Sequence, residues 1–424
     1  APRRAALALI AAVLDERRTL DEARGPALEG LSGPDRARAG DLAAAALRWL
    51  RPIDALLAEQ MRRPIEAKAR VARDGLRLAV AEVAALGAPP HAAVDAAVRL
   101  AKEDRRSAPL AGLVNAVARK ATLAAPARLS GPEARAEAAP PWLARRLASA
   151  WGPAADAILA AHLGDACFDV TLRDPGQTQL WATSLGAEPT PTGSLRRHRA
   201  LALAAAPGFA EGAWWPQDAA AAIPARLLGD IRGRRVVELC AAPGGKTLQL
   251  AAAGAQVTAV DASETRLVRL RENLARTGLA AEAVVADALD WRPPGPADAV
   301  LLDAPCSGTG TIRRHPDLPH LKRESDIAAL AALQDGLLDA AWAMVAPGGR
   351  LVFATCSLLP EEGEERAAAF LTRAPGARRV PVTVAEASEP DLITPEGDLR
   401  TRPDHWPAIG GLDGFFAARF EKSA

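Results

Sequence analysis

The second half of the chain alternates short apolar runs with segments of helical spacing, and this alternation restricts the fold more than any other feature. From about residue 231, runs rich in Val, Leu and Ala predict strands that are buried on both faces. Such strands are typical of a parallel sheet covered by helices, where ligands bind outside the carboxyl ends of the strands. The predicted strands are Arg235–Leu239, Gln256–Asp261, Glu282–Ala286, Ala297–Leu302 and Arg350–Thr355, with helices beginning at Gly245, Glu264, Ser325 and Gln334.

A glycine-rich turn follows the first predicted strand, with the sequence Cys-Ala-Ala-Pro-Gly-Gly-Lys-Thr at residues 240–247. A phosphate-binding P-loop is excluded, because Cys240 stands where that motif needs its first glycine, and the G-x-G-x-x-G dinucleotide pattern is also absent. The turn still lets a ligand approach the backbone and the amides of a helix N-terminus. This arrangement suits the carboxylate and ribose of S-adenosylmethionine.

Three aspartates follow successive predicted strands at Asp261, Asp287 and Asp303. A single aspartate at a strand end often only caps a helix. Three of them beside a glycine-rich turn predict a ligand site, and Asp261 lies about 20 residues beyond the turn, where a ribose hydroxyl pair would be held.

Two of the four cysteines stand in contexts suited to chemistry: Cys306, within Pro-Cys-Ser-Gly-Thr-Gly, and Cys356, within Thr-Cys-Ser. A thiolate is the side chain best suited to add covalently to an electron-poor ring such as cytosine, so the pair predicts covalent catalysis. Cys167 is interpreted as a core residue, and Cys240 as part of the core or of a pocket wall. No C-x-x-C spacing is present, which favours a reducing, cytoplasmic location and no zinc site.

Residues 3 to 120 show helical spacing throughout, with breaks at residues 30–34 and 87–90, and predict an all-helical domain. Ser32 can cap one helix and Pro90 can open another. The chain carries a net charge of only +1, but residues 1–130 carry +7, which favours a domain that binds a polyanion.

Residues 121–141 are rich in Ala, Pro and Glu and are predicted to be a linker. A small connecting α/β subdomain is expected up to about residue 215. Trp214 and Trp215 at its end are expected to pack against the next domain rather than to stack on bases. No apolar stretch is long enough to predict a membrane-spanning helix, and no membrane partner is expected.

The motifs around Cys240, Cys306 and Cys356 resemble those of the RsmB/Sun family of S-adenosylmethionine-dependent RNA 5-methylcytosine methyltransferases. Leu47-Arg48-Trp49-Leu50 and Val114-Asn115-Ala116-Val117, among other N-terminal segments, are similar to the NusB-like RNA-binding domain of the RsmB branch. The resemblance implies a multidomain protein with a NusB-like helical domain (1–125), a connecting α/β subdomain (140–215) and a Rossmann-like methyltransferase domain (216–424).

The resemblance also implies roles for single residues. Cys356 would be the nucleophile, Cys306 would assist release of the methylated RNA, and Asp303 would bind the cytosine edge. Lys246 would supply positive charge, or be only a solvated lysine at a helix start. S-adenosylmethionine would be held through its methionine end by the turn, through its ribose by Asp261, and near its adenine by Asp287, with Asp303 close by. The turn residues concerned are Cys240, Ala241, Ala242, Pro243, Gly244, Gly245 and Lys246. No metal is needed.

Two basic clusters and one acidic run remain. Arg196-Arg197-His198-Arg199 is either a phosphate contact or a solvated turn, and Arg313-Arg314-His315-Pro316 is expected to contact RNA. The acidic run Glu361–Glu365 is expected to start a helix. The expected partner of this monomer is ribosomal RNA of the small (16S) subunit. The alternatives are a transfer RNA cytosine methyltransferase and a non-catalytic NusB-like RNA-binding or assembly factor.

Overall fold

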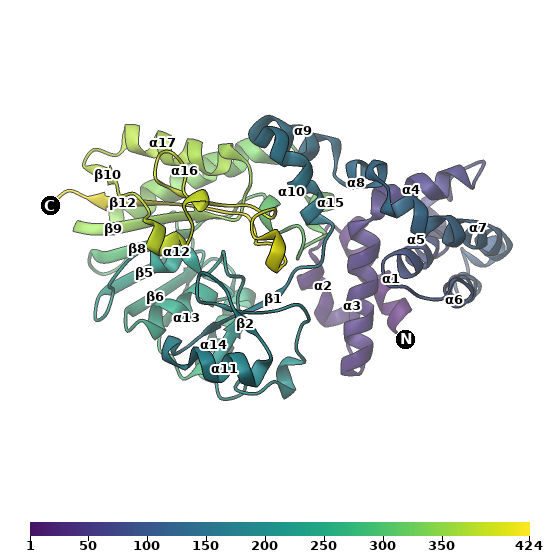
Figure 1. Ribbon diagram of the computed structural model, residues 1–424, viewed down its shortest axis with the longest axis horizontal. Coiled ribbons are helices and arrows are strands. Elements are labelled where there is room, and N and C mark those ends of the chain that lie inside the picture. The colour runs from purple at the N-terminus through teal and green to yellow at the C-terminus, as the bar shows by residue number, and fades with distance from the viewer. The chain divides into compact units, whose positions relative to one another are not determined.

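The computed structural model describes residues 1–424 and divides into two compact units (Figure 1). The helical unit comprises Ala1–Gly164 together with Ile312–Glu324, and the sheet unit comprises Asp165–Thr311 together with Ser325–Ala424. The chain therefore passes from one unit to the other three times. The segment that follows the Cys306 motif belongs to the helical unit, although it is flanked on both sides by the sheet unit.

The helical unit contains no strand, as its sequence spacing predicts, and its helices enclose one apolar core that includes Leu9, Ile10 and Leu47. The Ser32 hydroxyl accepts a hydrogen bond from the Asp35 amide at the start of α3, and α6 begins at Pro90, so both predicted helix starts are confirmed. The helices are α1 (Pro2–Leu14), α2 (Leu20–Ala27), α3 (Gly33–Arg48), α4 (Leu50–Glu59), α5 (Arg70–Ala84), α6 (Pro90–Glu103), α7 (Ala111–Ser130), α8 (Pro132–Ala138), α9 (Pro141–Trp151), α10 (Ala155–His162) and α15 (Leu318–Leu321).

The predicted linker at residues 121–141 is wrong, because α7, α8 and the first residue of α9 occupy almost all of it. Alanine is the strongest helix former, and Ala121, Ala125 and Leu129 recur every four residues and are buried in the core. The composition of the segment suggested a flexible chain, but its spacing is helical.

The first part of the sheet unit is a small antiparallel sheet in the order β2-β3-β1-β4. Trp214 and Trp215 on its last strand are buried. Trp215 packs against residues of the following domain, as expected, whereas Trp214 packs in the core of the small sheet itself. Cys167 is buried as well. The elements are β1 (Phe168–Leu172), α11 (Thr178–Leu185), β2 (Glu188–Pro189), β3 (Leu195–Arg197) and β4 (Trp214–Pro216).

The large sheet has the order β10-β12-β9-β8-β5-β6-β7, with β11 paired to β12. The five predicted strands form its parallel part. From β5 the chain adds β6 and β7 on one side and then β8 and β9 on the other, so the strand order reverses between β5 and β8. Such a switch point is where open α/β sheets bind ligands. The strands are β5 (Arg235–Leu239), β6 (Gln256–Asp261), β7 (Glu282–Val285), β8 (Ala297–Asp303), β9 (Val345–Thr355), β10 (Ala377–Arg379), β11 (Leu399–Thr401) and β12 (Phe415–Lys422).

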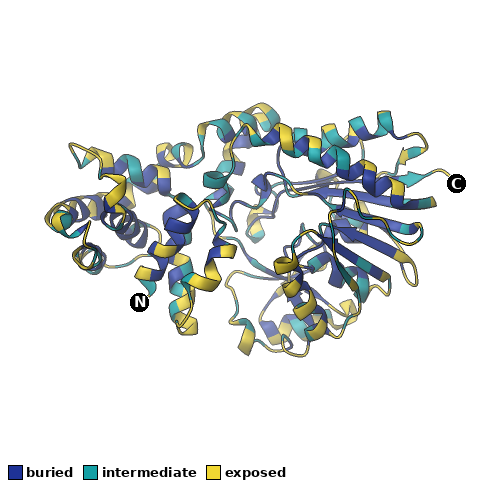
Figure 2. Cartoon of the chain, turned by 180° about the vertical axis from the view of Figure 1, so that it is seen from behind, coloured by how far each residue is buried: buried dark blue, intermediate teal, exposed yellow.

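Helices cover both faces of the large sheet, in which the inner strands β5, β8 and β12 are largely buried and the edge strands β7 and β10 are not (Figure 2). Alternate residues of a strand point to opposite faces, so Val236 joins one apolar core and Val237 the other. Helices α12 and α13 contribute to the first core and α16 and α17 to the second. The helices are α12 (Ile223–Arg226), α13 (Gly245–Ala252), α14 (Glu264–Thr277), α16 (Asp326–Met344), α17 (Glu364–Arg373) and α18 (Val384–Ala387).

Two predictions for this part of the chain need correction. A separate helix beginning at Gln334 is wrong, because Gln334 lies in the middle of the single helix α16. The sheet is also not purely parallel, since β12 pairs antiparallel with β9. Helix α16 is long and apolar enough to span a membrane by length and composition, but half of it is buried and it packs on β8 and β9 as a core helix.

Candidate active site

The glycine-rich turn after β5 is tightly folded against its surroundings. Cys240 has φ +60° and Gly244 has φ +104°, which is the left-handed region that favours glycine. A Cβ atom on Gly244 would lie 2.9 Å from Cγ of Leu270 on α14, so a larger residue does not fit there. The Ala242 amide donates to Asp261 Oδ2 at 3.0 Å, which ties the turn to the end of β6.

The three strand-end aspartates gather around this turn. Asp261 ends β6, Asp303 ends β8, and Asp287 lies two residues beyond β7. The three residues therefore lie at the carboxyl end of the parallel part of the sheet, where β8, β5, β6 and β7 run side by side. Burial, followed by the negative charges of Asp303 and Asp261, raises the pKa of Cys240 to about 12, and Asp287 acts in the same direction. Cys240 is therefore a neutral thiol in the wall of an acidic site and not a reactive thiolate.

Lys246, at the second position of α13, forms an ion pair with Asp303, with 2.7 Å between Nζ and Oδ2. Its side chain is buried and its ammonium lies over the Phe415 ring, 5.3 Å from the ring centre. The alternative of a solvated lysine is therefore wrong. Burial opposes its charge, but Asp303, Glu238 and Cys356 together raise the pKa of Lys246, so it stays cationic close to the Cys356 thiol.

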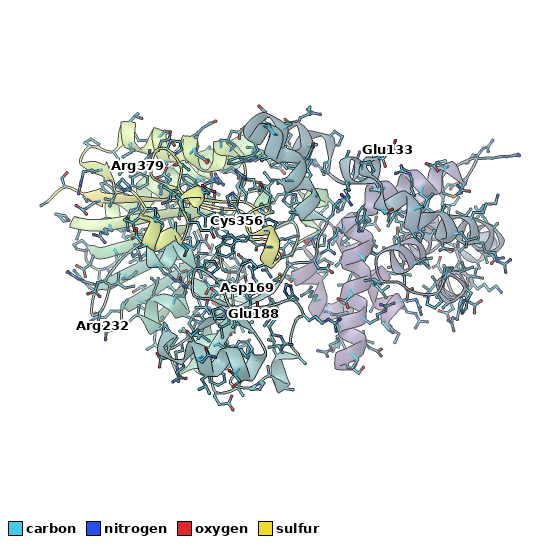
Figure 3. The ribbon with its side chains drawn as sticks, in the orientation of Figure 1. Glu133, Asp169, Glu188, Arg232, Cys356 and Arg379 are labelled. Atoms are coloured by element: carbon cyan, nitrogen blue, oxygen red, sulfur yellow. The ribbon has the colours of Figure 1, made fainter.

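The two motif cysteines meet at the ends of adjacent parallel strands, with Cys306 just after β8 and Cys356 just after β9. Their Sγ atoms are 3.4 Å apart. The Gly310 amide donates to the Cys356 carbonyl at 2.9 Å, so the loop that carries Cys306 also holds the backbone of Cys356. Cys356 lies across the sheet unit from Arg232, which precedes the opposite, amino end of β5 (Figure 3).

The Cys306 thiol keeps its own proton at neutral pH. The hydrogen bond with Cys356, burial and the negative charges of Cys356 and Glu362 all raise the pKa of Cys306 well above its ordinary value. Cys306 is therefore a thiol at neutral pH and can donate a hydrogen bond to the sulfur of Cys356.

The expectation for the acidic run after Cys356 is only partly correct. Glu364 and Glu365 begin α17, but Glu362 precedes it and is completely buried. Its carboxylate accepts hydrogen bonds from Ser307 and Ser357, the residues that follow the two cysteines. Sequence reasoning did not predict a role for these three residues. The sequence marks Glu362 only as one of four glutamates between residues 361 and 365.

The basic clusters also differ from expectation. Arg196 is buried and pairs with Asp169 through two of its three guanidinium nitrogens, so neither a phosphate contact nor a solvated turn describes it. Arg199 is exposed. Arg313 is buried, so the expected RNA contact is wrong for that residue.

The fold and the site together define a class of protein. A Rossmann-like sheet with a glycine-rich turn, three strand-end aspartates and two adjoining thiols is a methyltransferase domain that uses S-adenosylmethionine. A family model described as 16S rRNA methyltransferase RsmB/F matches residues 226–421, and a NusB family model matches residues 1–122.

The chain belongs to the RsmB/F family of 16S ribosomal RNA methyltransferases. It is 37% identical to ribosomal RNA small subunit methyltransferase B of Pseudomonas putida, over 100% of this chain and 99% of that protein. It is 34% identical to the protein of the same name from Klebsiella pneumoniae, over 97% of this chain and 95% of that protein.

Solved structures agree on the fold. The crystal structure of PH0851 is similar over 100% of this chain and 99% of its own, with a TM-score of 0.79 and 24% identity. A methyltransferase homolog protein from Pyrococcus horikoshii covers 66% of this chain and 93% of its own, with a TM-score of 0.55 and 26% identity.

Proposed function

We propose that this protein methylates carbon 5 of a cytosine in small-subunit ribosomal RNA through a covalent adduct with Cys356. The observation that carries the proposal is the pair of thiols 3.4 Å apart beside the Lys246–Asp303 ion pair. The relatives named small subunit methyltransferase B support the substrate. We further propose that the protein acts in the cytoplasm as a monomer without a metal.

The residues around the turn fit S-adenosylmethionine. When bound, it supplies a methyl group on a positively charged sulfur. Asp261 would hold the ribose and Asp287 the adenine region, and the turn from Cys240 to Lys246 would hold the methionine end. Gly244 keeps the turn closed, because its left-handed backbone and its contact with Leu270 leave no room for a side chain.

Cys356 would act first. Its thiolate adds to carbon 6 of cytosine, and the electron pair of the ring double bond makes carbon 5 nucleophilic. Lys246 stabilises the thiolate, since its buried ammonium lies close to Cys356. Asp303 would bind the cytosine edge and favour protonation at ring nitrogen 3.

Cys306 would act in release. After methylation, the proton on carbon 5 passes to water, the ring double bond re-forms, and the bond between carbon 6 and Sγ of Cys356 breaks with its electron pair returning to sulfur. Because the pKa of Cys306 is raised, its thiol keeps a proton that can hydrogen-bond the departing thiolate.

We also propose three domains, with boundaries at 1–125, 140–215 and 216–424, in which the first binds RNA. The NusB family match to residues 1–122 and the +7 charge of residues 1–130 support this division.

Bisulfite sequencing of ribosomal and transfer RNA from cells with and without the gene tests the substrate. Loss of one 5-methylcytosine in small-subunit ribosomal RNA is the expected result. Loss of a 5-methylcytosine in a transfer RNA would instead support the transfer RNA methyltransferase. If neither RNA loses a 5-methylcytosine, both enzymatic proposals are contradicted.

Substitution of each cysteine tests the covalent steps. Cys356→Ala should abolish methyl transfer and form no adduct. Cys306→Ala should form the adduct and fail to release it, so that RNA migrates with the protein on a denaturing gel. Equal loss of activity in both variants with no adduct would contradict these roles.

A further inference from the structure

The Glu362 carboxylate lies at the centre of a buried hydrogen-bond network. It is 0% exposed and accepts four hydrogen bonds in the structure. Oε1 accepts from the Ser307 amide at 2.8 Å and from Gln334 Nε2 at 3.2 Å. Oε2 accepts from the Ser357 hydroxyl at 2.6 Å and from the Ser307 hydroxyl. All four donors are neutral, and no arginine or lysine pairs with Glu362.

These donors come from the two loops that carry the thiols. Ser307 follows Cys306, and Ser357 follows Cys356, so one carboxylate joins the two loops at the residues adjacent to the cysteines. Gln334 extends the network, because its Nε2 also donates to the Pro305 carbonyl at 2.9 Å, on the other side of Cys306. The Cys306 loop is therefore held on both sides of its thiol.

The energetic cost of this arrangement argues for a specific role. A buried carboxylate without a cationic partner loses several kcal/mol of solvation, whereas an apolar residue of similar size would fill the same space without that loss. A carboxylate adds what an apolar residue lacks: a rigid plane with acceptor sites on two oxygens, which can fix two separate loops at once. Its negative charge also contributes to keeping the proton on Cys306.

We propose that Glu362 is a positioning residue that fixes the spacing of Cys306 and Cys356, and that release of the methylated RNA depends on it more than formation of the adduct does. The inference rests on the covalent function proposed above. Adduct formation needs Cys356 at the end of its strand and the Lys246–Asp303 ion pair, neither of which Glu362 hydrogen-bonds directly. Release also needs the Cys306 thiol at a fixed distance from the departing sulfur, and a displacement of about 1 Å in such a geometry can cost roughly 100-fold in rate.

The test compares Glu362→Gln with Glu365→Gln, a matched control at an exposed position three residues further on. Each protein is incubated with transcribed 16S ribosomal RNA and S-adenosylmethionine, and both the methylated product and the covalent adduct are measured over time. Glu362→Gln should accumulate adduct and turn over about 10- to 100-fold more slowly, whereas Glu365→Gln should match the wild type. Glu362→Asp, which keeps a carboxylate, should release product faster than Glu362→Gln.

The Cys306→Ala variant separates this inference from the proposed function. If Cys306→Ala traps no RNA, the covalent release function itself fails. If Cys306→Ala traps RNA but Glu362→Gln lowers adduct and product in equal proportion, or leaves turnover unchanged, the positioning role is overturned. Should Glu362→Gln not fold, Ser307→Ala and Ser357→Ala each remove one donor and should give a smaller accumulation of adduct; no accumulation in either variant would equally overturn it.

Discussion

The buried ion pair between Arg196 and Asp169 allows a sharp prediction about the stability of the sheet unit. The two residues are directly opposite each other on β3 and β1, and their side chains are 4% and 0% exposed. Arg196 Nε and one terminal nitrogen donate to the two carboxylate oxygens at 2.7 and 2.6 Å. The other terminal nitrogen donates to the Gly411 carbonyl at 2.6 Å, which ties the small sheet to the segment before β12.

Arg196→Met should destabilise the sheet unit strongly. It leaves the Asp169 carboxylate buried with only the Ala219 amide as a remaining donor, at 3.1 Å. Removing one partner of a buried ion pair typically costs about 3–5 kcal/mol. For a unit of about 250 residues, in which 1 kcal/mol shifts Tm by roughly 2–4 °C, the expected decrease is on the order of 6–20 °C.

Scanning calorimetry of the full chain measures this decrease, and the transition that moves on addition of S-adenosylmethionine identifies the sheet unit. Arg199→Met is the control, because Arg199 lies in the same stretch but is exposed, and it should change stability by less than about 0.5 kcal/mol. The double variant Asp169→Leu with Arg196→Met removes both charges and should be more stable than Arg196→Met alone. The reasoning is refuted if Arg196→Met behaves like Arg199→Met, or if the double variant is no more stable than Arg196→Met.

Two further predictions concern groups close to the proposed reaction. Lys246→Met should lower the rate of adduct formation by roughly 100-fold or more in single-turnover experiments, because it removes the cation beside Cys356 and leaves Asp303 unpaired; an unchanged rate would exclude an electrostatic role for Lys246. Burial raises the pKa of Glu238 from 4.5 to about 8, so the folded state retains a proton that the unfolded chain loses, and stability should fall as pH rises from about 4.5 to 8. Glu238→Gln should remove this dependence: urea unfolding should show the variant gaining on the wild type between pH 6 and pH 8.5, and a constant difference would contradict the assignment.

The parallel sheet and its ligand edge were predictable from local patterns. Each core strand is a short apolar run, and each aspartate follows its run directly, so strand direction alone places Asp261 and Asp303 at the same edge. The antiparallel strand β12 was not predicted, although its run Phe415–Lys422 contains three phenylalanines, which favour strands. Pairing of β12 with β9 joins segments more than 60 residues apart, and nothing in the local sequence specifies that partner.

Buried charges were the main failure of sequence reasoning. Arg196 stands in a run of basic residues that suggests a surface, yet its partner Asp169 lies 27 residues earlier and is brought opposite by the register of β1 and β3. Glu362 likewise stands in an acidic run, but the turn before α17 directs it inward. A charged residue in a charged run is normally solvated, so only the three-dimensional pairing distinguishes these two from their neighbours.

The course of the chain explains why the thiol loop needs an internal anchor. After Cys306 the chain leaves the sheet unit at Thr311 and continues in the helical unit, where the Asp317 carboxylate accepts from the Leu20 amide at 3.0 Å. A loop whose far end is held in another unit is not fixed by the strands on either side of it, unlike the Cys356 loop between β9 and α17. Hydrogen bonds from Gly310 to the Cys356 carbonyl and from Ser307 to Glu362 supply that constraint within the sheet unit. The 3.4 Å spacing of the two thiols therefore depends on these hydrogen bonds. Substitutions that remove them should alter the reaction even when both cysteines are kept.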